Sequence, residues 1–331
     1  MAEPLRRRVR AALLRGTTSI AGVLPRSSVR AGLGALARIG THTAYGERAR
    51  MNLVAALGDE LSPAECEQLA RAVFAHSGRQ LGEWLRLARS GPFEPGSSRG
   101  AWIDAVVHID DSIARLEEVL AAGRGAIIVT AHLGNWELLA AALRRRGMHG
   151  AVVGLAKRND SSANWLTSMR RACGVETLAQ DSPPRQLLRV LKSGGILGLL
   201  PDLEVRRLDG EFLPFFGRPA LTMTAPAAFA RAHRAPLVPV RCVATDVAPG
   251  AGAGEYVLSV AEPLALDAAL PRREATLDLT TRLNSLFEQW IRETPEQWAW
   301  HQNRWRTAPG EYDAVPLVER HRRKRAELEQ S

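Results

Sequence analysis

One short stretch, residues 126–139 (AIIVTAHLGNWELL), constrains the fold of this 331-residue chain more than any other. Its first four residues form an apolar, mostly β-branched run that follows two glycines, which is typical of a buried parallel strand. From Trp136 the apolar spacing becomes that of a helix, which ends around Gly147. A strand that passes directly into a helix predicts a βαβ fold, in which ligands bind where the strands end.

Two ionisable side chains, His132 and Glu137, lie where this strand meets the helix. On a regular helix, residues five apart point about 140° away from each other, so the two can pair only if His132 precedes the helix. With Gly134 in the bend, Glu137 can accept a hydrogen bond from one ring nitrogen and leave the other as a general base. A capping histidine beside a solvated glutamate explains the same spacing.

The alternation of strands and helices continues along the chain. We expect strands at 102–108, 151–156, 175–178, 196–200, 237–240 and 255–260, and helices at 111–122, 161–172, 183–191, 222–232 and 281–293. Between two of these elements, residues 212–217 (FLPFFG) read as an aromatic loop. The pattern predicts an α/β fold with a mostly parallel central sheet flanked by helices.

The composition is that of a globular protein with an anionic partner. Apolar residues make up 46% and charged residues 24%, and the net charge is +9. This charge favours a nucleic acid, a membrane surface or a phosphorylated substrate. The three cysteines, Cys66, Cys173 and Cys242, are far apart, so they imply neither a disulfide framework nor a zinc cluster.

The N-terminal segment is basic and only modestly apolar. Four arginines within residues 6–10 precede residues 11–24, which are too short and polar for a spanning helix of about 20 apolar residues. Residues 29–39 are amphipathic, and two ordinary packing helices or two helices in an anionic membrane interface both fit the pattern. The predicted organisation is basic membrane-associating helices at 1–45, a single α/β domain at 46–310 with a helical lead-in at 46–120, and a charged tail at 311–331.

Several polar residues follow predicted strands or lie on the helix after one. Arg158 comes just after the strand at 151–156, and Asn164 and Arg171 lie on the next helix. Arginine forks suit phosphate, so these residues are candidate anion clamps, although each can equally be surface charge.

A carboxylate, Asp202, directly follows the predicted strand at 196–200 and precedes the paired aromatic residues Phe215 and Phe216. Such an arrangement can position a cationic group or mark the mouth of an apolar pocket.

The chain resembles the bacterial lipid A biosynthesis acyltransferases, the late lauroyl and myristoyl transferases of lipopolysaccharide assembly. Five ordered motifs carry the resemblance: TAHLGNWE, KRNDSSANWLTSMRR, LLPDLE, FLPFFGRPALTMTAPAAFA and PEQWAWHQNRW. It implies a glycerolipid-acyltransferase-like fold at the cytoplasmic face of the inner membrane. It also implies transfer of a fatty acyl chain from acyl carrier protein, or from coenzyme A, to a hydroxyl of a lipid A precursor, with no metal.

Carried over residue by residue, the resemblance makes His132 the base and Glu137 its partner, and backbone N–H groups near Gly134 are expected to support the oxyanion. The remaining matches are Arg158 in the basic stretch, Arg171 on the helix and Asp202 in the Pro-Asp pair. Related enzymes that acylate phosphatidylinositol mannosides carry an acidic residue where this chain has Pro214. A lipid A precursor is therefore the predicted acceptor, and such a mannoside is the alternative.

Three other interpretations stay open at this stage. Cys173 can act as a nucleophile, because flanking arginines can lower the pKa of its thiol. A membrane lipid-binding protein without catalysis fits the same basic N-terminus. Nucleic-acid binding can use the tryptophans and arginines at 298–306, but a lipid phosphate explains the same cations, so no nucleic acid is expected as a partner.

Overall fold

The computed structural model describes residues 16, 18, 24–90, 98, 100–154, 161–180, 182–204, 210–245 and 255–310. Arg158, the charged tail at 311–331 and most of the first 23 residues lie outside these ranges.

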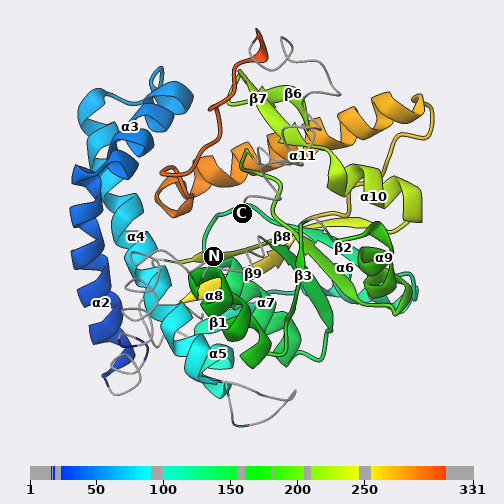
Figure 1. The fold of residues 1–331 in the computed structure, drawn as a ribbon, viewed down its shortest axis with the longest axis horizontal. Helices are drawn as coiled ribbons and strands as arrows, with labels where there is room; N and C mark the ends of the chain where they lie inside the picture. Colours follow the sequence, from blue (N-terminus) through cyan, green and yellow to red (C-terminus); the bar gives the residue numbers. More distant parts are fainter. Residues whose placement is uncertain are drawn as a thin grey trace, which may run out of the picture.

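A seven-stranded sheet forms the centre of the molecule, in the order β1-β9-β8-β2-β5-β3-β4 (Figure 1). The strands are β1 (Val107–Ile109), β2 (Ala126–Val129), β3 (Gly150–Gly154), β4 (Glu176–Ala179), β5 (Ile196–Leu199), β8 (Leu237–Ala244) and β9 (Tyr256–Val260). Neighbouring strands are parallel except for β8 and β9, which run antiparallel. The predicted mostly parallel α/β sheet is confirmed.

Helices cover both faces of this sheet, and a separate hairpin follows β5. The α-helices are α2 (Arg26–Ala37), α3 (Ala44–Leu57), α4 (Pro63–Ser90), α5 (Ala101–Val106), α6 (Ile113–Ala121), α7 (Trp136–Arg145), α8 (Ser161–Ala172), α9 (Pro184–Lys192), α10 (Ala225–His233) and α11 (Arg272–Glu293). Two 3₁₀ turns, η1 (Arg38–His42) and η2 (Pro295–Gln297), and the antiparallel hairpin of β6 (Gly210–Phe215) and β7 (Arg218–Met223) complete the described elements.

Strand β2 lies between two hydrophobic cores, which explains its uninterrupted apolar sequence. Ile127 and Val129 belong to the core under α9, α10 and α11. Ala126 and Ile128 belong to the core under α5, α7 and α8. Because successive side chains of a strand point to opposite faces, both sets must be apolar, and the end of β2 is held rigidly from both sides.

Two predicted elements are wrong in type. Residues 102–108 are mostly helix α5 rather than a strand, and the Nε of Arg145 on α7 holds this helix at Asp104 Oδ1 over 2.7 Å. Residues 212–217 are not a loop, because they form the end of β6 and the turn of the hairpin. Phe216 and Gly217 make this turn with positive φ angles of 51° and 67°. Alternation of short apolar runs does not reveal α5, which a distant arginine holds, or the hairpin, whose turn depends on the positive φ angles of two residues.

Helix α2 packs along α4 through a buried charge cluster (Figure 1). The guanidinium of Arg26 donates to both oxygens of Glu83 over 2.6 and 3.0 Å, and Glu83 is fully buried. Both Arg26 and Arg30 also pair with Glu255 at the start of β9. Among the described residues, no helix combines the length and the apolar character that crossing a membrane requires.

Candidate active site

The loop at 130–135 connects β2 to α7 and carries His132. Helix α7 begins only after Asn135, whose side-chain oxygen accepts hydrogen bonds from Leu138 N at 3.1 Å and Trp84 Nε1 at 3.0 Å. Gly134 has a φ of 62°, and a Cβ there would lie 2.1 Å from the carbonyl oxygen of Cys242, so only glycine fits. The prediction that His132 precedes the helix is confirmed.

The hydrogen-bond partner of His132 is Asp202, not Glu137. His132 Nδ1 lies 2.8 Å from Asp202 Oδ1, and the backbone N–H of His132 donates to Asp202 Oδ2, also over 2.8 Å. Strands β2 and β5 are neighbours, with Val129 opposite Leu199. His132 and Asp202 each lie three residues beyond this pair, so strand register brings the two side chains together.

Asp202 is completely buried and accepts three hydrogen bonds. The third comes from Trp298 Nε1, again over 2.8 Å, to Oδ2. Burial opposes the charged form of Asp202, but the charge of His132 and the hydrogen bonds from His132 and Trp298 outweigh it, so the pKa of Asp202 lies below its usual value. An ionised Asp202 fixes the proton on Nδ1 of His132 and leaves Nε2 as the basic nitrogen.

Residues 297–299, which follow α11, hold the loop at 130–135 (the histidine loop) through two backbone hydrogen bonds. Gly134 N donates to the carbonyl of Gln297 over 3.1 Å, and Ala299 N donates to the carbonyl of His132 over 3.0 Å. The side chain of Gln297 in turn bonds to both the N–H and the carbonyl of Ala244 on β8. The tryptophan-rich motif therefore shapes the histidine loop, a role that its sequence did not reveal.

Glu137 pairs with a different cation. Its carboxylate accepts from Arg170 Nε at 2.9 Å and from Arg170 Nη2 at 2.5 Å, and both side chains are largely buried. Burial works against the charge of Arg170, but the ion pair and hydrogen bonds with Glu137 prevail and raise the pKa of the guanidinium. The predicted hydrogen bond from His132 to Glu137 is wrong, because Glu137, in the first turn of α7, points toward Arg170 on α8.

Three of the backbone N–H groups around Gly134, where oxyanion support is predicted, already have hydrogen-bond partners. The N–H groups of His132, Gly134 and Asn135 donate to Asp202, to the carbonyl of Gln297 and to the carbonyl of Cys242, respectively. A donor that already has a partner cannot stabilise a developing oxyanion without losing that hydrogen bond.

Of the predicted anion clamps, those within the described residues lie on the surface. Asn164 and Arg171 are both exposed on α8, where the neighbouring Arg170 is the arginine that turns inward to Glu137. Arg158 falls outside the described residues.

Phe215 and Phe216 are buried, so the structure does not place them at a pocket mouth. The Phe215 ring packs 5.8 Å from the Trp298 ring and lies under the guanidinium of Arg304, while Phe216 packs against Trp300. These two residues support the wall that holds Trp298 in place.

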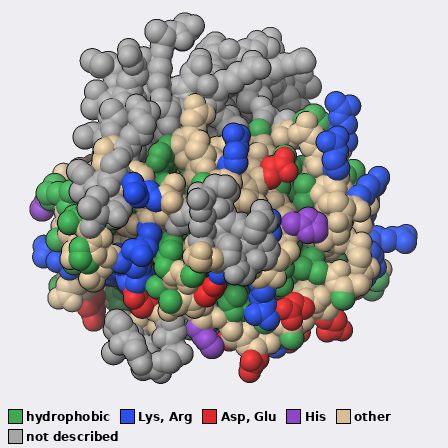
Figure 2. Space-filling model, turned by 90° about the horizontal axis from the view of Figure 1, so that it is seen from below, with side chains coloured by type: hydrophobic (Ala, Val, Ile, Leu, Met, Phe, Trp, Pro, Cys, Tyr) green, Lys and Arg blue, Asp and Glu red, His purple; other side chains and the backbone are tan. Residues whose placement is uncertain are grey.

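The alternative interpretations find little support in the structure. Cys173 is buried, and burial, together with the charge of Glu137, raises the pKa of its thiol to about 12, which removes the thiolate that a nucleophile needs. Trp298 and Trp300 are also buried and cannot stack on bases. On the face shown in Figure 2, Lys and Arg side chains are interspersed with Asp and Glu.

Two more histidines flank the site without touching Asp202. His76 is buried behind the loop and contacts the carbonyl of Gly134 through Nε2, and burial lowers its pKa to about 4. Burial and the nearby charge of His132 lower the pKa of His301 to about 4 as well. Within the described residues, no group of histidine, cysteine and carboxylate side chains is arranged to hold a metal ion.

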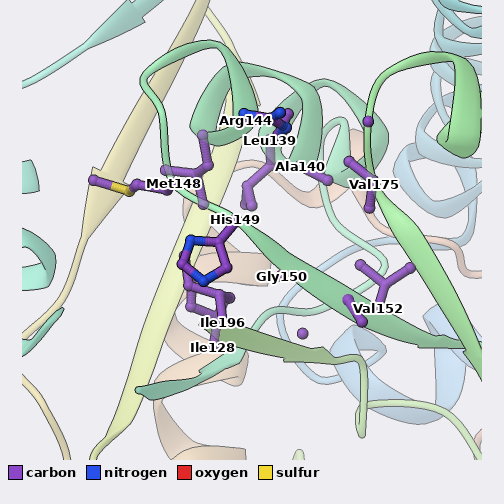
Figure 3. Close-up of a pocket in the computed structure, with 14 residues that line it drawn as sticks. Ile128, Leu139, Ala140, Arg144, Met148, His149, Gly150, Val152, Val175 and Ile196 are labelled. Carbon is purple, nitrogen blue, oxygen red and sulfur yellow. The ribbon is translucent and has the colours of Figure 1, made fainter. Parts of the chain in front are cut away.

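An apolar cavity lies beneath α7 (Figure 3). Its lining includes Ile128, Leu139, Ala140, Leu143, Met148, Val152, Val175 and Ile196. None of the predicted site residues lines it. Ile128, however, lies four residues before His132, about 13 Å along an extended strand.

A histidine held by a buried carboxylate at the end of a central strand is an arrangement suited to general-base catalysis. Comparison with known proteins identifies the family. The bacterial lipid A biosynthesis acyltransferase family matches residues 6–307. The chain belongs to this family. It is therefore an acyltransferase.

Curated relatives of this acyltransferase act on two kinds of lipid. It is 27% identical over 289 residues to a phosphatidylinositol mannoside acyltransferase of Mycobacterium tuberculosis, covering 85% of this chain and 84% of that protein. It is 25% identical over 249 residues to the lipid A biosynthesis lauroyltransferase of Escherichia coli, covering 75% and 76% of the two chains. A phosphatidylinositol mannoside acyltransferase of Mycolicibacterium smegmatis is 28% identical over 226 residues, covering 66% and 70%.

Proposed function

We propose that this acyltransferase transfers a fatty acyl chain from a thioester donor to a hydroxyl of a glycolipid, with His132 as the general base. The hydrogen bond between His132 Nδ1 and the buried Asp202 carries this proposal. No hydrogen bond within the described residues uses Nε2, and the His132 side chain is 27% exposed, so a substrate hydroxyl can reach that nitrogen.

The reaction needs no acyl-enzyme. Nε2 of His132 takes the proton of the acceptor hydroxyl as its oxygen attacks the thioester carbonyl. The new C–O bond forms, the C–S bond breaks, and the proton passes from the imidazolium to the leaving thiolate. Asp202 stabilises the imidazolium in between, since its carboxylate stays ionised throughout.

Two acceptors follow from the relatives: the longer alignment favours a phosphatidylinositol mannoside, whereas Pro214 favours a lipid A precursor. The mannoside acyltransferase of M. tuberculosis aligns over 85% of this chain, against 75% for the E. coli lauroyltransferase. A lipid A precursor, acylated from acyl carrier protein, is the second candidate and rests on the family description and on the E. coli relative.

We place the protein at the cytoplasmic face of the inner membrane. Six large apolar side chains are exposed in the described part of the chain, and all belong to its first 54 residues: Leu24, Leu36, Ile39, Tyr45, Met51 and Val54. The same helices border the site, because Asn52 Nδ2 donates to the carbonyl of Trp300 over 2.8 Å. An apolar face beside the site lets a glycolipid approach from the membrane interface.

The apolar cavity beneath α7 is where we place the distal end of the acyl chain. Its lining begins about 13 Å from His132 along β2, which is within reach of an extended fatty acyl chain. Ala140→Phe fills the cavity from α7 and is expected to shift the preferred donor to shorter chains, without lowering the rate with the shortest donor.

The decisive experiment is acyl transfer in vitro with both acceptors and with acyl carrier protein and coenzyme A donors, read by mass spectrometry of the lipid. We expect His132→Ala to abolish the product and Cys173→Ser to retain it. If the His132→Ala protein forms product at the wild-type rate, His132 is not the general base. If the wild type binds either lipid but makes no product with any donor, it is a lipid-binding protein instead.

A further inference from the structure

Three arginines line a second cavity, away from His132, where α10, α11 and β6 meet. Figure 1 shows these three elements side by side. The cavity encloses about 600 Å³ that is open to solvent, and its lining residues are Glu211, Thr224, Arg231, Arg272, Arg273, Thr276 and Leu277. We call it the arginine pocket.

Two of these guanidinium groups have no partner among the described residues. Arg273 is paired, because its Nη2 donates to Glu211 Oε1 over 2.8 Å. Arg231 and Arg272 make no hydrogen bond or ion pair with any described side chain or backbone group. The Nε of Arg231 is even buried without an acceptor. Leaving a buried donor unsatisfied costs about 1–3 kcal/mol, so this donor indicates that a bound ligand supplies its acceptor.

The backbone adds positive potential at the same place. Helix α11 begins at Arg272 without a side-chain cap, so its first N–H groups stay unpaired at the edge of the pocket. Helix α10 also begins at the pocket, just after Thr224, and it too has no side-chain cap. Unpaired N–H groups and the positive end of the helix dipole both favour an anion.

We propose that the arginine pocket binds a phosphate mono- or diester group of a substrate. Three guanidinium groups face a single carboxylate, Glu211, so the pocket keeps an excess of positive charge even with the Arg273 ion pair formed. The planar forks of Arg231 and Arg272 match the oxygens of a phosphate, and the hydroxyl of Thr224 adds a further polar contact.

The identity of the substrate rests on the proposed function. Thr276 lies eight residues, about 12 Å, along α11 from Asn284. The Asn284 side chain donates to the carbonyl of Pro214, and the next residue, Phe215, packs on Trp298 beside Asp202. These contacts tie the wall of the arginine pocket to the wall of the His132 site, so we assign the phosphate to one end of a long substrate whose other end reacts at His132. Coenzyme A carries such a phosphate, and so does a phosphoglycolipid.

Binding is tested first without any reaction. Inorganic phosphate is titrated into the full-length protein in detergent, and binding is followed by calorimetry or by ³¹P NMR line broadening. We expect Arg231→Gln and Arg272→Gln each to weaken binding at least about tenfold, since each removes a charge-assisted hydrogen bond worth about 1.5–3 kcal/mol. The matched control is Arg189→Gln, which removes an exposed arginine of helix α9 that does not line the pocket and is expected to bind phosphate like the wild type. Equal binding by the wild type and both pocket variants overturns the proposal.

Steady-state kinetics then identify the source of the phosphate. If it belongs to the donor, Arg272→Gln raises KM for acyl-coenzyme A about tenfold and leaves KM for an acyl-N-acetylcysteamine thioester, which has no phosphate, unchanged. If it belongs to the acceptor, KM for the phosphoglycolipid rises with either donor. In both cases kcat stays close to the wild-type value, because the pocket does not contact His132. Unchanged KM values for both substrates overturn the assignment to a substrate.

The two proposals fail separately. A protein that binds phosphate through Arg231 but acylates no glycolipid refutes the proposed function and leaves the anion site standing. If the wild type acylates a glycolipid and both pocket variants show unchanged kinetics, the proposed function stands and the assignment of the arginine pocket to a substrate is refuted.

Discussion

Glu137 and Asp202 are two buried carboxylates beside the same loop, and each holds one cation. Glu137 binds Arg170, whose side chain is 11% exposed, while Asp202 binds His132, whose side chain is 27% exposed. A guanidinium keeps its charge at every physiological pH, so the first pair can only tie α7 to α8. An imidazole gains and loses a proton near neutral pH, so the second pair can respond to chemistry at Nε2. A buried carboxylate acquires its role from its partner.

Of the substitutions that test this comparison, Asp202→Asn is expected to have the largest effect. An asparagine keeps the shape but no longer fixes the proton on His132 Nδ1 or stabilises the imidazolium, so we expect kcat to fall about 10³- to 10⁴-fold. Steady-state acyl transfer checks this, with circular dichroism to confirm folding. The control is Asp278→Asn on α11, a surface carboxylate paired with Arg282. A loss of tenfold or less would show that Asp202 is not needed to orient the base.

Glu137→Gln should act on stability instead. It leaves the charge of Arg170 buried without a counter-charge, so we expect the free energy of unfolding in urea to fall by about 3–5 kcal/mol, with kcat per folded molecule near the wild-type value. Adding Arg170→Gln removes the stranded charge and should recover part of the loss. A kcat as low as that of Asp202→Asn would instead make Glu137 part of proton transfer.

Trp298→Phe tests how much one hydrogen bond to Asp202 contributes to its role. It removes one of three donors to that carboxylate, a contact worth about 1.5–3 kcal/mol, so we expect kcat to fall roughly tenfold. Trp300→Phe is the matched control, because its Nε1 donates to the carbonyl of Pro295 rather than to Asp202. Equal losses of kcat in the two variants would mean that bulk, not the hydrogen bond, matters.

The smallest effect concerns His76, behind the loop. Its pKa falls from 6.5 to about 4 on burial, so the unfolded chain binds a proton between these values and the folded protein does not. Stability is therefore lost as pH falls through this window, by up to about 1.4 kcal/mol per pH unit for one proton. His76→Gln keeps a donor for the carbonyl of Gly134. Between pH 6.5 and about 4, its free energy of unfolding in urea should fall less steeply with decreasing pH than that of the wild type, by up to about 1.4 kcal/mol per pH unit. The exposed His42→Gln is the control, and an unchanged slope in His76→Gln contradicts the assignment.

Much of the fold is predictable from local patterns, because a strand such as Ala126–Val129 must be apolar on both faces and the helix after it begins at a polar cap. The predicted helix at 161–172 matches α8, and the predicted strand at 196–200 matches β5 within one residue. Local patterns are insufficient where a distant contact holds the element, as for α5, or where a turn needs a positive φ at a residue other than glycine, as for Phe216 in the β6–β7 hairpin.

The site is predictable in its members but not in its pairing. His132 and Asp202 both stand out as polar residues after buried strands, and their equal distance from the strand ends is a usable signal once β2 and β5 are known to be neighbours. Spacing along the chain instead favours Glu137, since it is only five residues away. Arg170 and Trp298 require the packed structure, because a helix arginine next to another arginine and one tryptophan among three carry no distinguishing local signal.

The clamp formed by Gln297, Trp298 and Ala299 has a consequence for how the enzyme matures. Synthesis proceeds from the N-terminus, so the imidazole and its carboxylate leave the ribosome long before these three residues do. Until then the loop lacks its two backbone ties, and Asp202 lacks one of its three hydrogen-bond donors. The histidine loop therefore reaches its final arrangement only after most of the chain has been made.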